Sequence, residues 1–146
     1  MPKAASHIIS IVLILAFALT LAGCGAALKE AAKLSEYEIG GENIPSITSA
    51  VGEREVTNVE SSTNNGIVSK QYTYVSASVY DDLLAYVKLL MEDGWLVTKD
   101  IDLNVVPGSG ELGKKASEEG RILLISLAYE DGKYAIKVTK GKGTIE

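Results

Sequence analysis

Two short dipeptides constrain the fold of this chain more than any other feature, because each of them predicts a tight β-hairpin. Type I′ turns need positive φ at both central residues, and Asn-Gly and Asp-Gly meet that need best. With Asp131-Gly132 as a two-residue loop, Glu130 faces Lys133 and apolar residues face one another further along the strands. These apolar pairs are Tyr129 with Tyr134, Leu127 with Ile136, and Ile125 with Val138. Residues 140–146 beyond this hairpin are predicted to fray.

A second hairpin is predicted over residues 55–75, with Asn65-Gly66 as its loop. This register pairs Val59 with Tyr72, Thr57 with Tyr74, and Val56 with Val75. The run Asn64-Asn65-Gly66 also fits a three-residue loop. That loop would shift the pairing of the two strands by one residue, so this alternative register stays open.

One amphipathic helix is predicted to begin at Ser78 and to end before Gly94. Ser78, with Asp81 three residues later, resembles the capping box that begins many helices. At the other end, Gly94 suits a left-handed C-cap, and Trp95 suits the hydrophobic contact that follows such a cap. A stripe of apolar side chains at helical spacing is predicted to pack on a sheet: Tyr80, Leu83, Leu84, Val87, Leu90 and Met91. Leu89 lies off this stripe and is predicted to be exposed.

The remaining segments complete an α+β fold. Residues 44–51 are predicted to form an irregular or edge strand, residues 95–106 a strand, and residues 107–120 a long polar loop. The predicted order is therefore β-β-α-β-β-β. Its short connections favour a two-layer sandwich, with a mostly antiparallel sheet and one helix on one face.

The N-terminus has the pattern of an export signal. A single charged residue, Lys3, precedes an apolar run from Ile8 to Ala22. A run of about 15 residues is typical of a signal-peptide core, whereas a membrane-spanning helix needs about 20. The run ends in Leu21-Ala22-Gly23-Cys24, which resembles the lipobox of bacterial lipoprotein precursors.

This resemblance implies a lipid anchor. In that family the thiol of the cysteine is alkylated with diacylglycerol, a peptidase cuts just before it, and the cysteine becomes the acylated N-terminus. Carried over to this chain, Leu21, Ala22 and Gly23 are the recognition residues and Cys24 is the lipidation site. The implied partner is a bacterial membrane, on its extracytoplasmic face. Gly25 permits either an outer membrane or the membrane of a Gram-positive cell.

Three segments follow from this reading of the sequence. Residues 1–23 are a lipoprotein signal peptide, residues 24–43 are the lipidated cysteine with an Ala-, Lys- and Glu-rich tether, and residues 44–146 are a small α+β domain. The Gly40-Gly41 pair is interpreted as the break that ends the tether.

Composition excludes several classes of function. The chain has one histidine, His7, and one cysteine, and the predicted processing removes the first and blocks the second. The mature part then has no histidine for a Ser-His-Asp or Cys-His site or for a histidine-bearing zinc site. A net charge of −5 argues against nucleic acid as a partner. No catalytic residue and no cofactor are therefore predicted.

One pattern is similar to a metal site. Asp100, Asp102, Asn104 and Glu111 occupy positions one, three, five and twelve of an EF-hand calcium loop. The loop departs from that pattern at Val105, where the sharp turn needs glycine, and at Pro107. We favour no metal here and keep calcium binding as an alternative.

The function predicted from sequence is a membrane-anchored, non-catalytic binding or accessory module. Its ligand is a protein or a carbohydrate, bound by a face of tyrosines, unless those tyrosines pack in the core. One alternative is a subunit of a larger cell-envelope complex, with an exposed apolar patch around Leu89 or Leu112. The other is a calcium-binding or carboxylate-dependent enzyme domain.

Overall fold

The computed structural model describes residues 24–145. The predicted signal peptide, with Leu21, Ala22 and Gly23 of the lipobox, lies outside the described residues. The described region is α+β, with helices on one face of a sheet, as predicted. Its elements, in chain order, are α2 (Cys24–Ala32), β1 (Glu36–Ile39), β2 (Glu42–Pro45), α3 (Ile47–Val51), β3 (Glu55–Asn64), β4 (Ile67–Val75), α4 (Val79–Glu92), β5 (Leu96–Lys99), β6 (Gly108–Lys115), β7 (Arg121–Glu130) and β8 (Lys133–Lys142).

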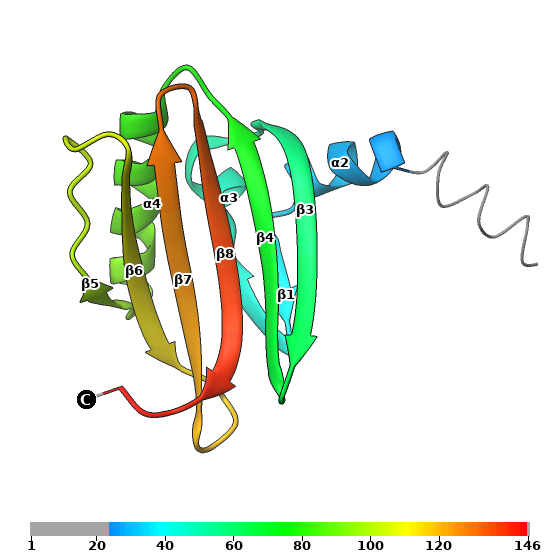
Figure 1. The fold of residues 1–146 in the computed structure, drawn as a ribbon, viewed down its shortest axis with the longest axis vertical. Coiled ribbons are helices and arrows are strands. Elements are labelled where there is room, and N and C mark those ends of the chain that lie inside the picture. Colours follow the sequence, from blue (N-terminus) through cyan, green and yellow to red (C-terminus); the bar gives the residue numbers. More distant parts are fainter. Residues whose placement is uncertain (1–23, 146) are drawn as a thin grey trace, which may run out of the picture.

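A six-stranded antiparallel sheet forms the body of the molecule, with strand order β3-β4-β8-β7-β6-β5. A two-stranded sheet, β1-β2, lies behind it together with α3 and α4 (Figure 1). The helix α2 lies beside β3, at one edge of the large sheet (Figure 1). One face of the sheet is therefore covered, and the face toward the viewer in Figure 1 is open.

The C-terminal hairpin confirms the predicted register. Tyr129 pairs with Tyr134, Leu127 with Ile136, Ile125 with Val138, and Glu130 with Lys133. The prediction of a frayed tail is wrong at its start, because β8 continues to Lys142 and Lys140 is buried. The ammonium of Lys140 donates to the carbonyl oxygen of Gly40 at 2.8 Å and pairs with Glu118 at 3.2 Å. These polar contacts offset the free-energy cost of burying the charged ammonium group.

The first hairpin confirms the two-residue loop at Asn65-Gly66, where both residues have positive φ. Val59 pairs with Tyr72 as predicted, and the register holds down to Asn58. It then shifts at a β-bulge at Thr57, so that Val56, rather than Thr57, faces Tyr74. The bulge lets Val56 enter the core, which a regular register does not allow.

The helix α4 is confirmed, but the predicted buried stripe is only partly correct. Gly94 has φ 92°, and the N–H of Trp95 donates to the carbonyl oxygen of Leu90 at 3.0 Å, which closes the helix as predicted. Leu83, Tyr86 and Leu90 face the sheet, and Leu89 packs against the core instead of being exposed. Three members of the predicted stripe are exposed instead: Tyr80, Leu84 and Met91.

The long polar loop predicted over residues 107–120 is wrong, since β6 occupies Gly108–Lys115. The strand expected over residues 95–106 is correspondingly short and ends at Lys99. Glycines explain why β6 escaped prediction. The side chain of Ile101 occupies the space where a Cβ at Gly110 would lie. At Gly108 the carbonyl oxygen of Val105 and the ring of Tyr129 occupy the corresponding space. The strand carries few apolar residues because its neighbours fill its inner surface.

The domain also begins earlier than residue 44. Glu36–Ile39 forms β1, whose Tyr37 and Ile39 are fully buried, and Gly40-Gly41 is the turn into β2. Residues 24–43 are therefore helix and hairpin in this structure, and not a tether outside the domain. The predicted edge strand over residues 44–51 is instead the end of β2 followed by the short helix α3.

The core lies between the sheet and the covering elements. The hydroxyl groups of Tyr37 and Tyr74 are 2.6 Å apart, and the rings of Tyr37 and Tyr72 stack with centroids 4.5 Å apart. Tyr86 of α4 donates to the carbonyl oxygen of Pro45 at 2.7 Å. Buried tyrosines thus join the small sheet to the large sheet through ring packing and a hydrogen bond, and join α4 to the small sheet through a second hydrogen bond.

Candidate functional site

A row of polar side chains crosses the open face of the large sheet from edge to edge. Cross-strand pairing places one residue from each strand at the same level, and directly paired residues project from the same face. From β3 to β5 this polar row is Glu60, Gln71, Lys137, Ser126, Glu111 and Lys99. Acidic and basic groups are both present along it: an amide separates Glu60 from Lys137, and a hydroxyl group separates Lys137 from Glu111.

Next to the polar row lies a row of short side chains. Thr73, Ala135, Ala128 and Ser109 are paired in sequence across β4, β8, β7 and β6. Their shortness leaves a trough that runs across the strands. At a strand spacing of about 4.8 Å, the four strands give the trough a length of about 15 Å. We call this feature the transverse trough, and Thr73, Ala135, Ala128 and Ser109 are its floor.

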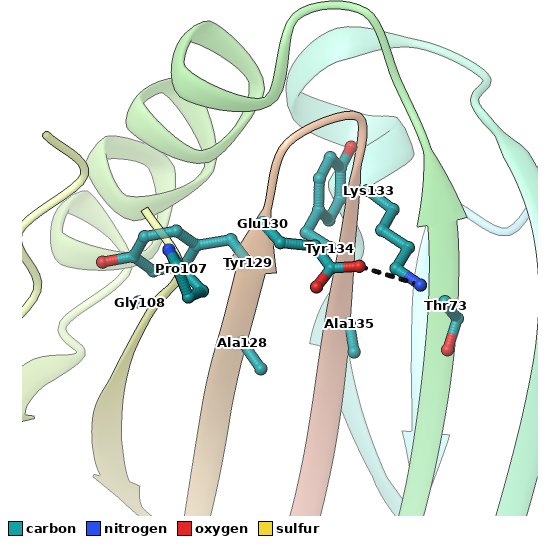
Figure 2. A pocket seen from close by; sticks show the side chains of 9 residues that line it. All are labelled: Thr73, Pro107, Gly108, Ala128, Tyr129, Glu130, Lys133, Tyr134 and Ala135. Carbon is teal, nitrogen blue, oxygen red and sulfur yellow. Dashed lines mark ion pairs between the residues drawn. The ribbon is translucent and has the colours of Figure 1, made fainter. Parts of the chain in front are cut away.

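The longer side chains on either side form the walls of the trough. On one side Lys133 and Glu130 form an ion pair of 2.8 Å between Nζ and Oε1 (Figure 2). On the other side are Gln71, Lys137 and Glu111 of the polar row. Two hollows of about 290 and 200 Å³ share Ala128 and Ala135, so they form one continuous depression. Pro107 and Gly108 lie at its β6 end (Figure 2).

The charged side chains of the polar row differ in how many partners they have. Glu111 is held in place, because Thr98 Oγ1 donates to it at 2.8 Å and Lys99 Nζ lies 3.8 Å from its other carboxylate oxygen. Lys137 is exposed and forms no ion pair within the described residues. A fixed carboxylate and a free ammonium, two strands apart, are suited to recognising a ligand with both donors and acceptors.

Sequence reasoning missed the trough because it depends on β6. The sequence predicts a polar loop over residues 107–120, so Ser109 is not placed on a strand and no fourth strand is available for the row. The register of the other strands was accessible, since the C-terminal hairpin alone places Ala128 opposite Ala135.

The calcium-loop residues do not come together as an EF-hand. Glu111 lies on β6 in the polar row, while Asp102 Oδ1 accepts a hydrogen bond from the N–H of Asn104 at 3.0 Å and so closes a local turn. Asp100 lies in the loop after β5. Within residues 24–145 no group of three or more His, Cys, Asp or Glu side chains is arranged to hold a metal ion.

A second candidate site is the carboxylate of Asp82, which is buried at the start of α4. Its two oxygens accept hydrogen bonds from Arg54 Nε and Nη2 at 2.8 and 2.9 Å, from Ser76 Oγ at 2.7 Å and from Tyr134 OH at 2.9 Å. Burial raises the pKa of Asp82, but these donors outweigh that effect and hold it below its usual value. The same arrangement raises the pKa of Tyr134, mainly through burial. Because its own chain supplies all of these partners, the carboxylate joins strand to helix and presents no free base.

Most of the residues expected from the sequence to form a tyrosine face and exposed apolar patches are buried or packed against the core. Six tyrosines are buried on the covered side of the sheet, and only Tyr80 is exposed: the buried six are Tyr37, Tyr72, Tyr74, Tyr86, Tyr129 and Tyr134. Leu112 is fully buried and Leu89 packs against the core, so neither forms an exposed patch. The tyrosines act in the core, which was the other interpretation of the sequence.

Over residues 24–145 no helix has the length and apolar character needed to cross a membrane. Comparisons with protein-family models, with curated proteins and with solved structures found no match to this chain.

Proposed function

We propose that this protein is a lipid-anchored binding module on the extracytoplasmic face of a bacterial membrane, and that its ligand is an extended polypeptide segment lying in the transverse trough. The anchor is the acylated Cys24 implied by Leu21-Ala22-Gly23-Cys24. The observation that carries the choice of ligand is the trough itself, an uncovered row of short side chains with polar walls.

The chemistry of the trough supports a polypeptide over a carbohydrate. Carbohydrate sites commonly use exposed aromatic rings, and the tyrosines of the sheet lie on its covered face. Hydroxyl groups of Thr73 and Ser109, the amide of Gln71 and the charges of Lys137 and Glu111 match the donors and acceptors of a peptide backbone. A length of about 15 Å accommodates about four extended residues. Neither a catalytic group nor a cofactor is part of the proposal.

A photo-crosslinking residue tests the trough in living cells. Introduced at the exposed position Ala128, it is expected to yield one discrete adduct with one polypeptide. Ala135→Trp in the same chain is expected to abolish the adduct, because an indole fills the neighbouring part of the floor. The same residue introduced at Ala26, which is exposed on α2 and remote from the trough, is expected to give no such adduct. Equal adducts from Ala128 and Ala26, or none from Ala128, contradict the proposal.

A larger cell-envelope complex is the alternative, and one observation favours it. Tyr80, Leu84 and Met91 are exposed on α4 at helical spacing, and Tyr80 lies beside Leu103 and Val106 of the loop after β5. Such an exposed apolar surface is typical of a protein interface. A crosslinker at Leu84 therefore provides the third position of the same experiment. An adduct from Leu84 with none from Ala128 assigns the interface to α4 in place of the trough.

A further inference from the structure

An apolar groove lies between α2 and the edge of the large sheet, on the side where the described chain begins. It has a volume of about 470 Å³. Ala27, Leu28, Ala31 and Leu34 line one side, and Val59 of β3 with Tyr72 of β4 lines the other. Leu34 and Val59 are among the exposed apolar residues of the chain, so the groove is open to a ligand.

The lining of the groove begins at Ala27, three residues after the cysteine that the proposed function acylates. The helix α2 begins at Cys24, and the groove-lining residues Ala27 and Leu28 follow about one helical turn after that start. From Cys24 to Ala32, where α2 ends, a helical rise of 1.5 Å per residue corresponds to about 12 Å. An acyl chain attached at position 24 therefore starts about one helical turn from the groove, within reach of its lining.

The negative charge of Glu30 beside the groove favours an esterified acyl chain over a free fatty acid. Glu30 lies at its rim and repels the carboxylate of a free fatty acid. An acyl chain esterified to glycerol on Cys24 has no charge to repel. Attachment also makes binding intramolecular, which raises the effective concentration of the chain at the groove.

We propose that this groove binds one acyl chain of the protein's own lipid anchor when the protein is away from a membrane. This inference rests on the proposed lipidation of Cys24. Two or more acyl chains in a bilayer anchor a protein stably, whereas one chain gives reversible binding. Sequestering a chain in the groove therefore lowers the cost of leaving the bilayer and makes the anchor exchangeable between membranes.

Spontaneous transfer of the mature lipidated protein between vesicles tests the groove. The protein is loaded on donor vesicles of phosphatidylethanolamine and phosphatidylglycerol, and its appearance on acceptor vesicles of the same lipids is followed. Ala27→Trp fills the groove and is expected to slow transfer at least about tenfold, because lost shelter for only two methylene groups already corresponds to that factor. Ala26→Trp is the matched control, because Ala26 is also exposed on α2 but does not line the groove. It is expected to transfer at the wild-type rate.

A second pair of variants makes the test independent of α2. Val59→Lys places a charge in the groove from β3 and is expected to slow transfer as Ala27→Trp does. Ile67→Lys adds the same charge at an exposed position of β4 outside the groove and is expected to have no effect.

The outcomes separate the groove from the anchor. Equal transfer rates for the groove variants and their controls, or no transfer of the wild type, overturn the groove. The intact mass of the same samples reports on acylation. Acylated protein with groove-independent transfer refutes only this inference, whereas protein without acyl chains refutes the lipid anchor as well.

Discussion

Asp82→Ala is expected to lower the free energy of unfolding by about 3–5 kcal/mol, the cost typical of breaking a buried ion pair by removing one partner. Asp82 is 1% exposed and accepts hydrogen bonds from Arg54, Ser76 and Tyr134. Without the carboxylate, a guanidinium and two hydroxyl groups lose their acceptor in or beside the core. Against a total stability of about 5–15 kcal/mol, this is a severe loss.

Urea unfolding followed by the fluorescence of Trp95 measures the change. Trp95 is the only tryptophan of the chain and is 2% exposed, so its emission reports the loss of the core. Asp81→Ala is the matched control, because Asp81 is exposed on the same helix, and it is expected to cost less than about 1 kcal/mol. Similar losses for the two variants contradict a central role of Asp82.

Asp82 also gives the stability a pH dependence of known sign. Its pKa in the folded protein is below its usual value, so the folded state binds this proton less readily than the unfolded state. The stabilisation is complete above the unfolded pKa of about 3.9 and is lost as the pH falls through the folded pKa. Between pH 5 and pH 3, we therefore expect the wild type to lose stability more steeply than Asp82→Asn. Parallel curves would show that the carboxylate is not responsible.

Gly110→Ala is the second large effect, with an expected loss of about 2–3 kcal/mol from overpacking. A Cβ at this position meets the side chain of Ile101 and lies 3.1 Å from two backbone atoms, the carbonyl oxygen of Asp100 and Cα of Ile101. Ile101 has to move, and the loop after β5 moves with it. Because the trough depends on β6, the variant is also expected to weaken the crosslink from Ala128.

Gly25→Ala provides the same substitution without the contact. No atom lies within 4 Å of a Cβ at Gly25, which is in α2, so alanine is expected to be neutral or slightly stabilising there through its helix propensity. Urea unfolding of the two variants compares them directly. If Gly110→Ala is as stable as Gly25→Ala, the packing of Ile101 against β6 is not as described.

Local turn chemistry made much of the sheet predictable. Asp131-Gly132 and Asn65-Gly66 set two hairpin registers, because the turn type defines which residues oppose each other. The C-terminal end of α4 was predictable for a similar reason, since Gly94 and Trp95 form a local cap, whereas at the other end the side chain of Ser78 forms no cap hydrogen bond. The bulge at Thr57 was not predictable, because only the packing of Val56 in the core reveals it.

Other features depended on tertiary contacts with no local signal. The strand β6 is rich in glycine because Ile101 and Tyr129 occupy its inner surface, and the sequence alone indicates a loop there. The buried face of α4 differs from the predicted stripe because it includes Asp82 and Tyr86. Their hydrogen-bond partners, Arg54 and Pro45, lie on distant segments of the chain. The trough requires correct registers for four strands at once, so one missed strand concealed it.

The lipid anchor at Cys24 is the claim on which the proposed function and the further inference both depend, and the intact mass of the protein extracted from its host's membranes tests it most directly. The predicted result is a polypeptide that begins at Cys24 and carries the added mass of a diacylglyceryl group. Recovery of residues 1–146 as a single unmodified chain would contradict the account.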